Sequence, residues 1–208
     1  MKKFSPALIF LFLCLAVSPA WAAKGHPDGT LVYAWSNNIG PLNPHAFGAN
    51  QMFGQALVYE SLVQYGPGGE IQPWLAESWE LSEDWLSYVF KLREDVVFSD
   101  GTPFNAEVVV KNFDHIMGAK PDWLEVALLT ESYEALDPFT FKLILKKPYT
   151  AALQELTLVR PIRFLGMAGF PDQGLTKDGI KKPVGTGPWP LVERKLGQYD
   201  LLERHEKY

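Results

Sequence analysis

The sequence predicts a mixed α/β fold, and three kinds of pattern support this class. Residues 87–92 and 139–146 alternate between apolar and polar side chains, which is typical of strands with one buried face. Residues 106–117 place apolar side chains at helical spacing. Clusters of Gly, Pro and Asp separate these segments and mark turns. Strands and helices do not alternate regularly, so we expect hairpins combined with helices rather than a repeating strand–helix unit.

The composition is that of an ordinary globular protein. The 208 residues are 47% hydrophobic and 21% charged, and the formal net charge is −5. This apolar content is sufficient to bury a core and excludes a disordered chain. No run of basic residues interrupts the mild acidity, which argues against nucleic acid as a partner.

Residues 1–22 have the pattern of a cleavable export signal. Lys2 and Lys3 precede a compact apolar stretch from Leu8 to Val17, and Ala20-Trp21-Ala22 places small residues at the positions that signal peptidase reads. The apolar stretch is shorter than the roughly 20 residues of a membrane span. We therefore predict a soluble protein exported to the periplasm.

Cleavage before Ala23 would divide the chain into a signal peptide, residues 1–22, and a mature domain, residues 23–208. Cys14 is the only cysteine and would leave with the signal. The mature domain would then have neither a disulfide nor a thiolate metal site.

The first predicted strand covers Thr30 to Trp35, a β-rich run that follows the turn-forming residues Pro27-Asp28-Gly29. A helix is predicted from Asn50 onward, because four side chains recur at helical spacing before Gly66-Pro67-Gly68-Gly69 ends the pattern. Those side chains are Met52, Ala56, Tyr59 and Val63.

The middle of the chain contains the clearest elements. The strand at 87–92 is followed by a turn at Ser99-Asp100-Gly101. Asn105 is a suitable N-cap for the next helix, which Gly118 is expected to end. The second alternating strand, at 139–146, follows this helix.

Motifs of enzymes are not evident. The chain has no Gly-rich phosphate loop, no HExxH and no GxSxG, and its histidines are too scattered for a local metal cluster. His115 is expected to be a surface or partly buried helix residue. His45 lies on a rigid Pro-containing loop and is the one candidate metal contact, with a structural role as the alternative.

Several aromatic and basic residues are candidate ligand contacts. Four tryptophans fall at loops or element edges, where an indole either packs in the core or lines a cleft; they are Trp74, Trp79, Trp123 and Trp189. Trp123 precedes a helix-like run, Leu124 to Leu129, and could project into a groove. Arg160 and Arg163 lie in an apolar stretch, where an arginine usually has an anionic partner, either a structural carboxylate or a bound ligand.

Ordered blocks of this sequence resemble the signature of the extracytoplasmic solute-binding proteins of peptide and nickel ABC importers, family 5. These blocks are Ile71–Trp79, Tyr88–Arg93, Val97–Val108 and Gly185–Trp189. Within that family, further segments are most similar to the nickel-binding branch. They are Asn38–His45, Asn50–Phe53, Trp123–Glu125, Leu153–Leu156 and Arg160–Phe164.

The resemblance implies a type II periplasmic binding protein, in which two α/β lobes close on a ligand and deliver it to the permease subunits of an ABC transporter. It implies a monomeric binding protein without intrinsic cofactor, not an enzyme. In the nickel branch the metal arrives in a small chelator that bears carboxylates. By matching blocks, Met52 is the cleft methionine, Trp123 the cleft tryptophan, and Arg160 the arginine that pairs with a chelator carboxylate.

Members of this family are more than twice as long as this chain. We therefore expect residues 23–208 to be an incomplete, mixed-sheet first lobe with the second lobe absent, and to fold or bind weakly in isolation. Two alternatives to a nickel chelate receptor remain. One is a peptide-binding protein in which Arg160 meets a terminal carboxylate, and the other is a truncated remnant without a transport role.

Overall fold

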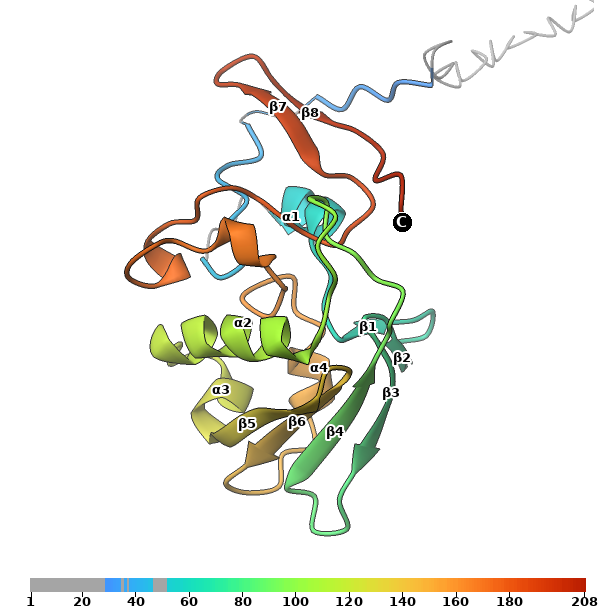
Figure 1. Cartoon of the computed structure of the whole chain (residues 1–208), viewed down its shortest axis with the longest axis vertical. Helices are drawn as coiled ribbons and strands as arrows, with labels where there is room; N and C mark the ends of the chain where they lie inside the picture. Colours follow the sequence, from blue (N-terminus) through green and yellow to red (C-terminus); the bar gives the residue numbers. More distant parts are fainter. Residues whose placement is uncertain (1–28, 35, 37, 47–51) are drawn as a thin grey trace, which may run out of the picture. The chain divides into compact units, whose positions relative to one another are not determined.

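The computed structural model describes residues 29–34, 36, 38–46 and 52–208. The chain divides into two units, residues 1–36 and 37–208, and the second holds every helix and strand that is described (Figure 1). The predicted signal peptide lies outside the described residues. Within the described part, none of the helices has the length and apolar content needed to cross a bilayer.

The prediction of a strand at Thr30 to Trp35 is wrong for the residues of this range that the structure describes. Residues 30–34 are described without strand structure, and Trp35 lies outside the described residues. Leu31 and Val32 are 88% and 75% exposed. A β-rich composition favours an extended backbone, but a strand also requires ladder hydrogen bonds with a neighbour, which composition does not supply.

A four-stranded antiparallel sheet organises the second unit. Its spatial order is β3 (Ala76–Leu81), β4 (Ser87–Leu92), β6 (Thr140–Leu145) and β5 (Thr130–Asp137). Phe90 lies opposite Phe141, and Tyr88 lies opposite Leu143. These four buried side chains share one face of the sheet, as the alternating patterns of the two central strands predicted.

Two separate hairpins flank this sheet in sequence. They are β1 (Val63–Tyr65) with β2 (Ile71–Pro73), and β7 (Leu191–Lys195) with β8 (Tyr199–Leu202). All strand pairings among the described residues are antiparallel. The α/β class is therefore confirmed, whereas the mixture of parallel and antiparallel strands expected from the resemblance is not found in the described strands.

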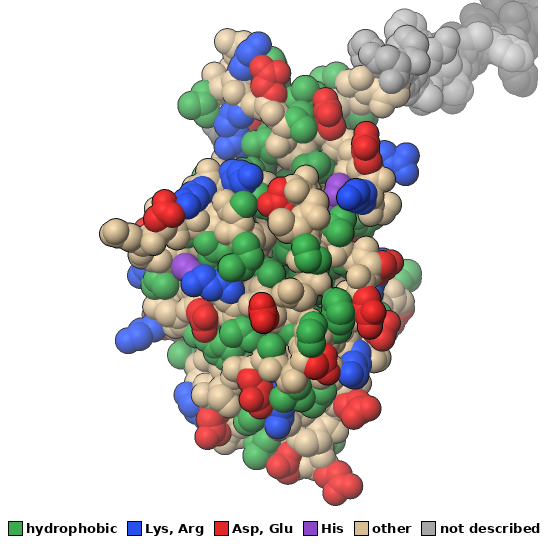
Figure 2. Space-filling view, viewed as in Figure 1, with side chains coloured by type: hydrophobic (Ala, Val, Ile, Leu, Met, Phe, Trp, Pro, Cys, Tyr) green, Lys and Arg blue, Asp and Glu red, His purple; other side chains and the backbone are tan. Residues whose placement is uncertain are grey.

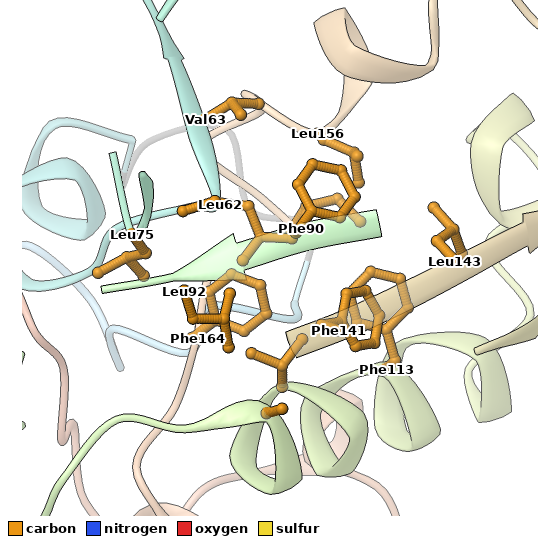
Figure 3. Close-up of a cluster of buried hydrophobic side chains, with 14 of the residues drawn as sticks. Leu62, Val63, Leu75, Phe90, Leu92, Phe113, Phe141, Leu143, Leu156 and Phe164 are labelled. Carbon is orange, nitrogen blue, oxygen red and sulfur yellow. The ribbon is translucent and has the colours of Figure 1, made fainter. Parts of the chain in front are cut away.

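Helix α2 (Ala106–Gly118) packs on the apolar face of the sheet. The Asn105 side chain accepts a hydrogen bond from the Val108 N–H at 3.0 Å, so the predicted N-cap and the predicted end at Gly118 are both confirmed. The rings of Phe113 and Phe141 lie 4.9 Å apart between α2 and β6 (Figure 3). This contact joins the helix and the sheet into one hydrophobic core.

Helix α1 (Met52–Val58) is shorter than predicted, and the expected start at Asn50 lies outside the described residues. The chain leaves the helix after Val58 because its next carbonyl groups serve distant segments. The Glu60 carbonyl accepts from the Phe164 N–H, and the Leu62 carbonyl accepts from the Trp74 N–H. The helical spacing in the sequence thus indicated which side chains are buried, whereas hydrogen bonds to distant segments ended the helix.

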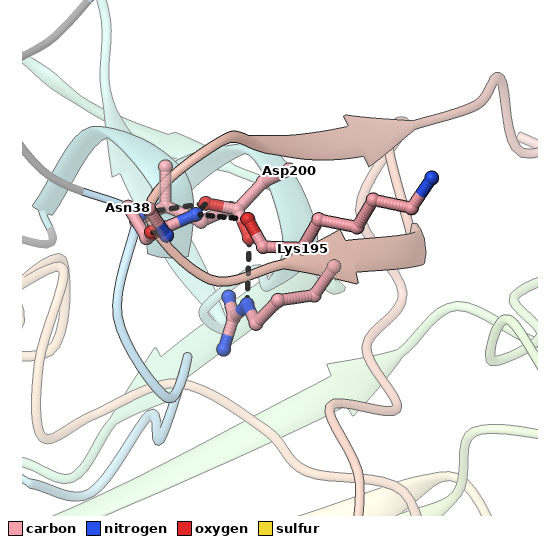
Figure 4. A network of polar contacts seen from close by, with 6 residues as sticks. Asn38, Lys195 and Asp200 are labelled. Atoms are coloured by element: carbon pink, nitrogen blue, oxygen red, sulfur yellow. Dashed lines mark hydrogen bonds and ion pairs between the residues drawn. The ribbon is translucent and has the colours of Figure 1, made fainter.

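Asp200 anchors the β7–β8 hairpin to residues 38 and 39 (Figure 4). Its carboxylate accepts hydrogen bonds from the Ile39 N–H at 2.8 Å, from Asn38 Nδ2 at 3.1 Å and from Arg194 Nε at 2.6 Å. Burial opposes ionisation of this carboxyl, but the three donors outweigh it and hold its pKa below the ordinary value.

Replacement Asp200→Asn is expected to lower the free energy of unfolding at pH 7 by about 1.5–3 kcal/mol, because it removes charge-assisted hydrogen bonds. The folded pKa is lowered, so this contribution is complete above the unfolded pKa and is lost as pH falls through the folded pKa. Urea unfolding of both proteins from pH 7 downward measures the difference. The difference in the free energy of unfolding between the two proteins should become smaller as the pH falls below about 5. A difference that stays constant with pH would contradict the lowered pKa of Asp200.

Candidate functional site

In the sequence, Trp123 precedes one short helix and Arg160 follows another, and the side chain of Glu155 joins the two helices. These helices are α3 (Glu125–Leu129) and α4 (Ala152–Glu155). The Glu155 carboxylate, at the end of α4, accepts a hydrogen bond from the Val126 N–H at 2.6 Å, in the first turn of α3. A carboxylate in this position satisfies a free N–H group of the helix end. The first turn of α3 is thereby held against the end of α4.

Arg160 is buried, with 7% of its surface exposed. Pro161 and Ile162 follow it, and both are also buried. Burial lowers the pKa of the Arg160 guanidinium, because removal from water disfavours the charged form. A carboxylate ligand at this guanidinium would offset that penalty and could accept two parallel hydrogen bonds.

The segment from Arg160 to Leu165 is supported from two sides. Asn112, fully buried on α2, donates to the Leu165 carbonyl at 3.0 Å and accepts from the Leu165 N–H at 2.7 Å. The Phe164 N–H donates to the Glu60 carbonyl at 3.2 Å. These bonds fix the backbone at Phe164 and Leu165, at the end of the segment that begins with Arg160.

Sequence reasoning did not identify Asn112 or Glu155 as positioning residues. Asn112 shares the apolar face of α2 with Val109, Phe113 and Ile116. A polar side chain in the middle of such a face predicts a specific buried partner. That signal was present in the sequence, although it could not name Leu165 as the partner.

Arg163 has structural partners. Its Nη1 donates to the Tyr59 carbonyl at 2.9 Å, and its guanidinium lies 4.7 Å from the centre of the Trp74 ring. Burial lowers the pKa of Arg163 to about 10, and the nearby Glu60 carboxylate opposes this shift. The contacts of Arg163 are therefore structural, to a backbone carbonyl and to the Trp74 ring.

His45 is engaged at both ring nitrogens. Nε2 lies 3.1 Å from the Arg163 carbonyl and Nδ1 lies 2.6 Å from Thr176 Oγ1. Burial lowers the pKa of His45 to about 4, so the ring is neutral near pH 7. Because a carbonyl only accepts, Nε2 carries the proton and Nδ1 accepts from the Thr176 hydroxyl. This geometry supports the structural alternative for His45.

The described residues contain no group of three or more His, Cys, Asp or Glu side chains that could hold a metal ion. Met52 and Trp123 present soft and aromatic surface instead. Met52 is the first residue of α1 and is 47% exposed, and Trp123 precedes α3 and is 48% exposed. An accessible thioether and an accessible indole can pack against the apolar edges of a ligand.

Comparison with known proteins gives consistent matches over this chain. The profile of bacterial extracellular solute-binding proteins, family 5 Middle, matches residues 70–208. The nickel-binding periplasmic protein of Escherichia coli (strain K12) is 44% identical over 200 residues, which cover 95% of this chain and 38% of that protein. The glutathione-binding protein GsiB of the same strain is 34% identical over 185 residues, which cover 85% of this chain and 34% of that protein.

A solved structure agrees with these sequence matches. NikA from Brucella suis, in complex with Fe(III)-EDTA, matches with a TM-score of 0.81 and 49% identity, over 85% of this chain and 36% of that chain. The chain thus spans well under half the length of each of these three relatives. The comparisons confirm the resemblance found in the sequence and the type II periplasmic binding protein fold class. They also agree with the prediction of a binding protein rather than an enzyme.

Proposed function

The chain belongs to the bacterial extracellular solute-binding proteins of family 5, and from this membership we propose that it captures a nickel–organic chelate for an ABC importer. In this proposal residues 1–22 direct export and are removed, and residues 23–208 act in the periplasm as part of the solute-binding domain. The partners are the chelate and the permease subunits in the inner membrane. The domain acts as a monomer and has no resident cofactor.

The choice of nickel rests on the relatives. The nickel-binding protein of Escherichia coli shares 44% of aligned residues with this chain, against 34% for the glutathione-binding protein of the same strain. The Brucella suis relative was solved with iron held by EDTA, a polycarboxylate chelator. A metal enclosed by carboxylates is therefore the ligand chemistry that we assign to this chain.

The buried guanidinium of Arg160 is the observation that carries the proposal. Arg160 begins the segment 160–165, whose last two residues are bonded through their backbone to Asn112 and Glu60. A planar guanidinium is suited to pair with a chelator carboxylate through two hydrogen bonds. Met52 and Trp123 would contact the apolar edges of the chelate, and the chelator would supply most of the metal ligands.

A peptide is the second candidate ligand, because a glutathione-binding protein is among the relatives. Arg160 would then pair with a terminal carboxylate of an extended backbone. The half-exposed indole of Trp123 favours the compact chelate, since a flat ring face covers a small ligand well.

Calorimetric titration of the purified chain tests the proposal, with nickel–histidine chelate, chelator-free nickel and glutathione as three separate ligands. The isolated chain is expected to bind the chelate weakly, and Arg160→Ala is expected to weaken this binding further by roughly 10- to 100-fold, the loss of one or two charge-assisted hydrogen bonds. Arg160→Lys keeps the charge and should retain part of the affinity. The matched control Arg204→Ala removes an exposed arginine and should change affinity less than about twofold.

The other outcomes are equally specific. Binding of glutathione without binding of the chelate would support the peptide alternative. Binding of neither ligand by a chain with a cooperative melting transition would support a remnant without transport function. Equal weakening by Arg160→Ala and Arg204→Ala would remove Arg160 from the site.

A further inference from the structure

Two buried histidines meet at Thr176, the first residue of a short 3-10 helix, η3 (Thr176–Asp178). The Thr176 N–H donates to His115 Nδ1 at 3.1 Å, and Thr176 Oγ1 lies 2.6 Å from His45 Nδ1. His115 belongs to α2 and His45 to the loop before α1, and both are almost fully buried. Only small patches of histidine surface are visible on the face of the molecule in Figure 2. Two rings from separate parts of the chain therefore hold the polar groups of Thr176.

The segment 170–179 lies against α2 and contacts both rings (Figure 1). The centre of the Phe170 ring is 4.8 Å from that of His115 and 6.4 Å from that of His45. We call the contacts of Phe170 and Thr176 with the two histidines the histidine latch. Its release would expose both rings to water.

The latch requires His115 to be neutral. A backbone N–H only donates, so His115 Nδ1 must carry no proton in order to accept from Thr176. Protonation of this nitrogen would place two donors face to face and break the bond. His45 already donates from Nε2 to the Arg163 carbonyl, so a further proton at its Nδ1 would bury a positive charge.

The groups around His115 favour its neutral form. Burial lowers the pKa of His115 from the ordinary value of 6.5, Lys111 lowers it further, and Asp114 opposes them only in part. Both charged residues lie on α2 itself. The groups that pack on the ring from the opposite segment, Phe170 and Thr176, are uncharged.

The groups around His45 act in the same direction. Burial lowers the pKa of His45 to about 4, and the nearby His115 adds to this shift. The Arg163 carbonyl and the Asn112 side chain favour the charged form of His45, but burial outweighs them. In water both rings would have a pKa near 6.5. Acid therefore favours the state in which the rings are exposed.

We propose that residues 170–179 are an acid-released segment, which neutral His45 and His115 hold against α2 at pH 7 and which detaches as the solution becomes acidic. The released state binds more protons than the latched state. The stabilisation of the latched state is therefore complete above about pH 6.5 and is lost as the pH falls toward the pKa values of the latched rings.

The latch is connected to helix α1, which begins with Met52. Asn43 Nδ2 donates to the Thr176 carbonyl, and the Asn43 carbonyl accepts from Gln55 Nε2 at 2.7 Å. The latch itself contains none of the residues proposed to contact the chelate. Its test needs no ligand, so its failure and the failure of the proposed function are separate results.

Amide hydrogen exchange of the purified chain at pH 7.5 and pH 4.5 tests the latch, with rates corrected for the intrinsic pH dependence of exchange. The protection of amides in 170–179 is expected to fall at least about 10-fold at pH 4.5, because two histidines bind protons more tightly in the released state. The protection of the central strands β4 and β6 should change less than about threefold. No fall in 170–179, or an equal fall in β4 and β6, overturns the proposal, because the latter would indicate global acid unfolding.

The variant His115→Asn separates protonation from packing. An asparagine Oδ1 can accept from the Thr176 N–H and does not titrate, so the acid-induced fall should shrink by at least about threefold. The matched control His205→Asn removes a buried histidine outside the latch and should leave the fall unchanged within about twofold. Equal falls in His115→Asn and the unmodified chain overturn the proposal.

Histidine ring NMR of the unmodified chain decides if His115→Asn does not melt cooperatively. The rings of His45 and His115 are expected to titrate below pH 6.5 in the folded chain, together with the loss of protection in 170–179. Titration of either ring at or above pH 6.5 overturns the proposal, because the latched state would then not disfavour its protonation.

Discussion

Replacement of Phe113 by alanine is expected to lower the free energy of unfolding by about 3–5 kcal/mol. The side chain is fully buried, and its ring lies 4.9 Å from the Phe141 ring, 5.3 Å from the Tyr133 ring and 6.5 Å from the Phe164 ring. Removing it opens a cavity where α2, the sheet and the segment that carries Arg160 meet. Urea unfolding followed by circular dichroism measures the loss.

The control for this cavity is Leu196→Ala, since Leu196 is 79% exposed. Its effect should stay within about 0.5 kcal/mol, as for most surface substitutions. A loss below about 1 kcal/mol at Phe113 would contradict its central position in the core, because large-to-small changes at buried aromatic residues exceed that value.

Replacement of Gly185 by alanine is expected to cost about 3 kcal/mol or more, at or above the upper range for over-packing. A Cβ atom at this position would lie 1.9 Å from the Val58 carbonyl oxygen and 2.7 Å from the Tyr59 ring. The neighbouring Gly187 N–H donates to the same Val58 carbonyl at 2.9 Å. The clash is with backbone, so either the end of α1 or the 185–187 segment must move.

Thermal melting and urea unfolding of Gly185→Ala measure this loss, and Gly101→Ala is the comparison. Gly101 has a φ of +84° with no atom within 4 Å of an added Cβ, so only conformational strain of about 1–2 kcal/mol is expected there. Equal losses at the two glycines would show that close packing against α1 is not the reason for Gly185. The expected result would give a physical meaning to the Gly185–Trp189 block that the sequence shares with its family.

The sequence by itself determined the elements whose pattern is local. The alternation at 87–92 and 139–146 correctly identified β4 and β6, and Asn105 and Gly118 correctly bounded α2. One face of each element meets the core, and burial of that face imposes a period of two or 3.6 residues that a single segment displays. The family blocks likewise named Met52, Trp123 and Arg160 as the candidate site.

The tertiary structure decided everything that depends on a distant partner. Asn38 binds Asp200 across 162 positions of the chain, and Asn112 binds Leu165 across 53. Distant backbone donors ended α1, and the Tyr59 carbonyl and the Trp74 ring became the partners of Arg163. The ring nitrogens of His45 likewise meet groups of Arg163 and Thr176, which lie far from it in the sequence. A local pattern records whether a residue is buried, whereas only the folded chain determines which group lies beside it.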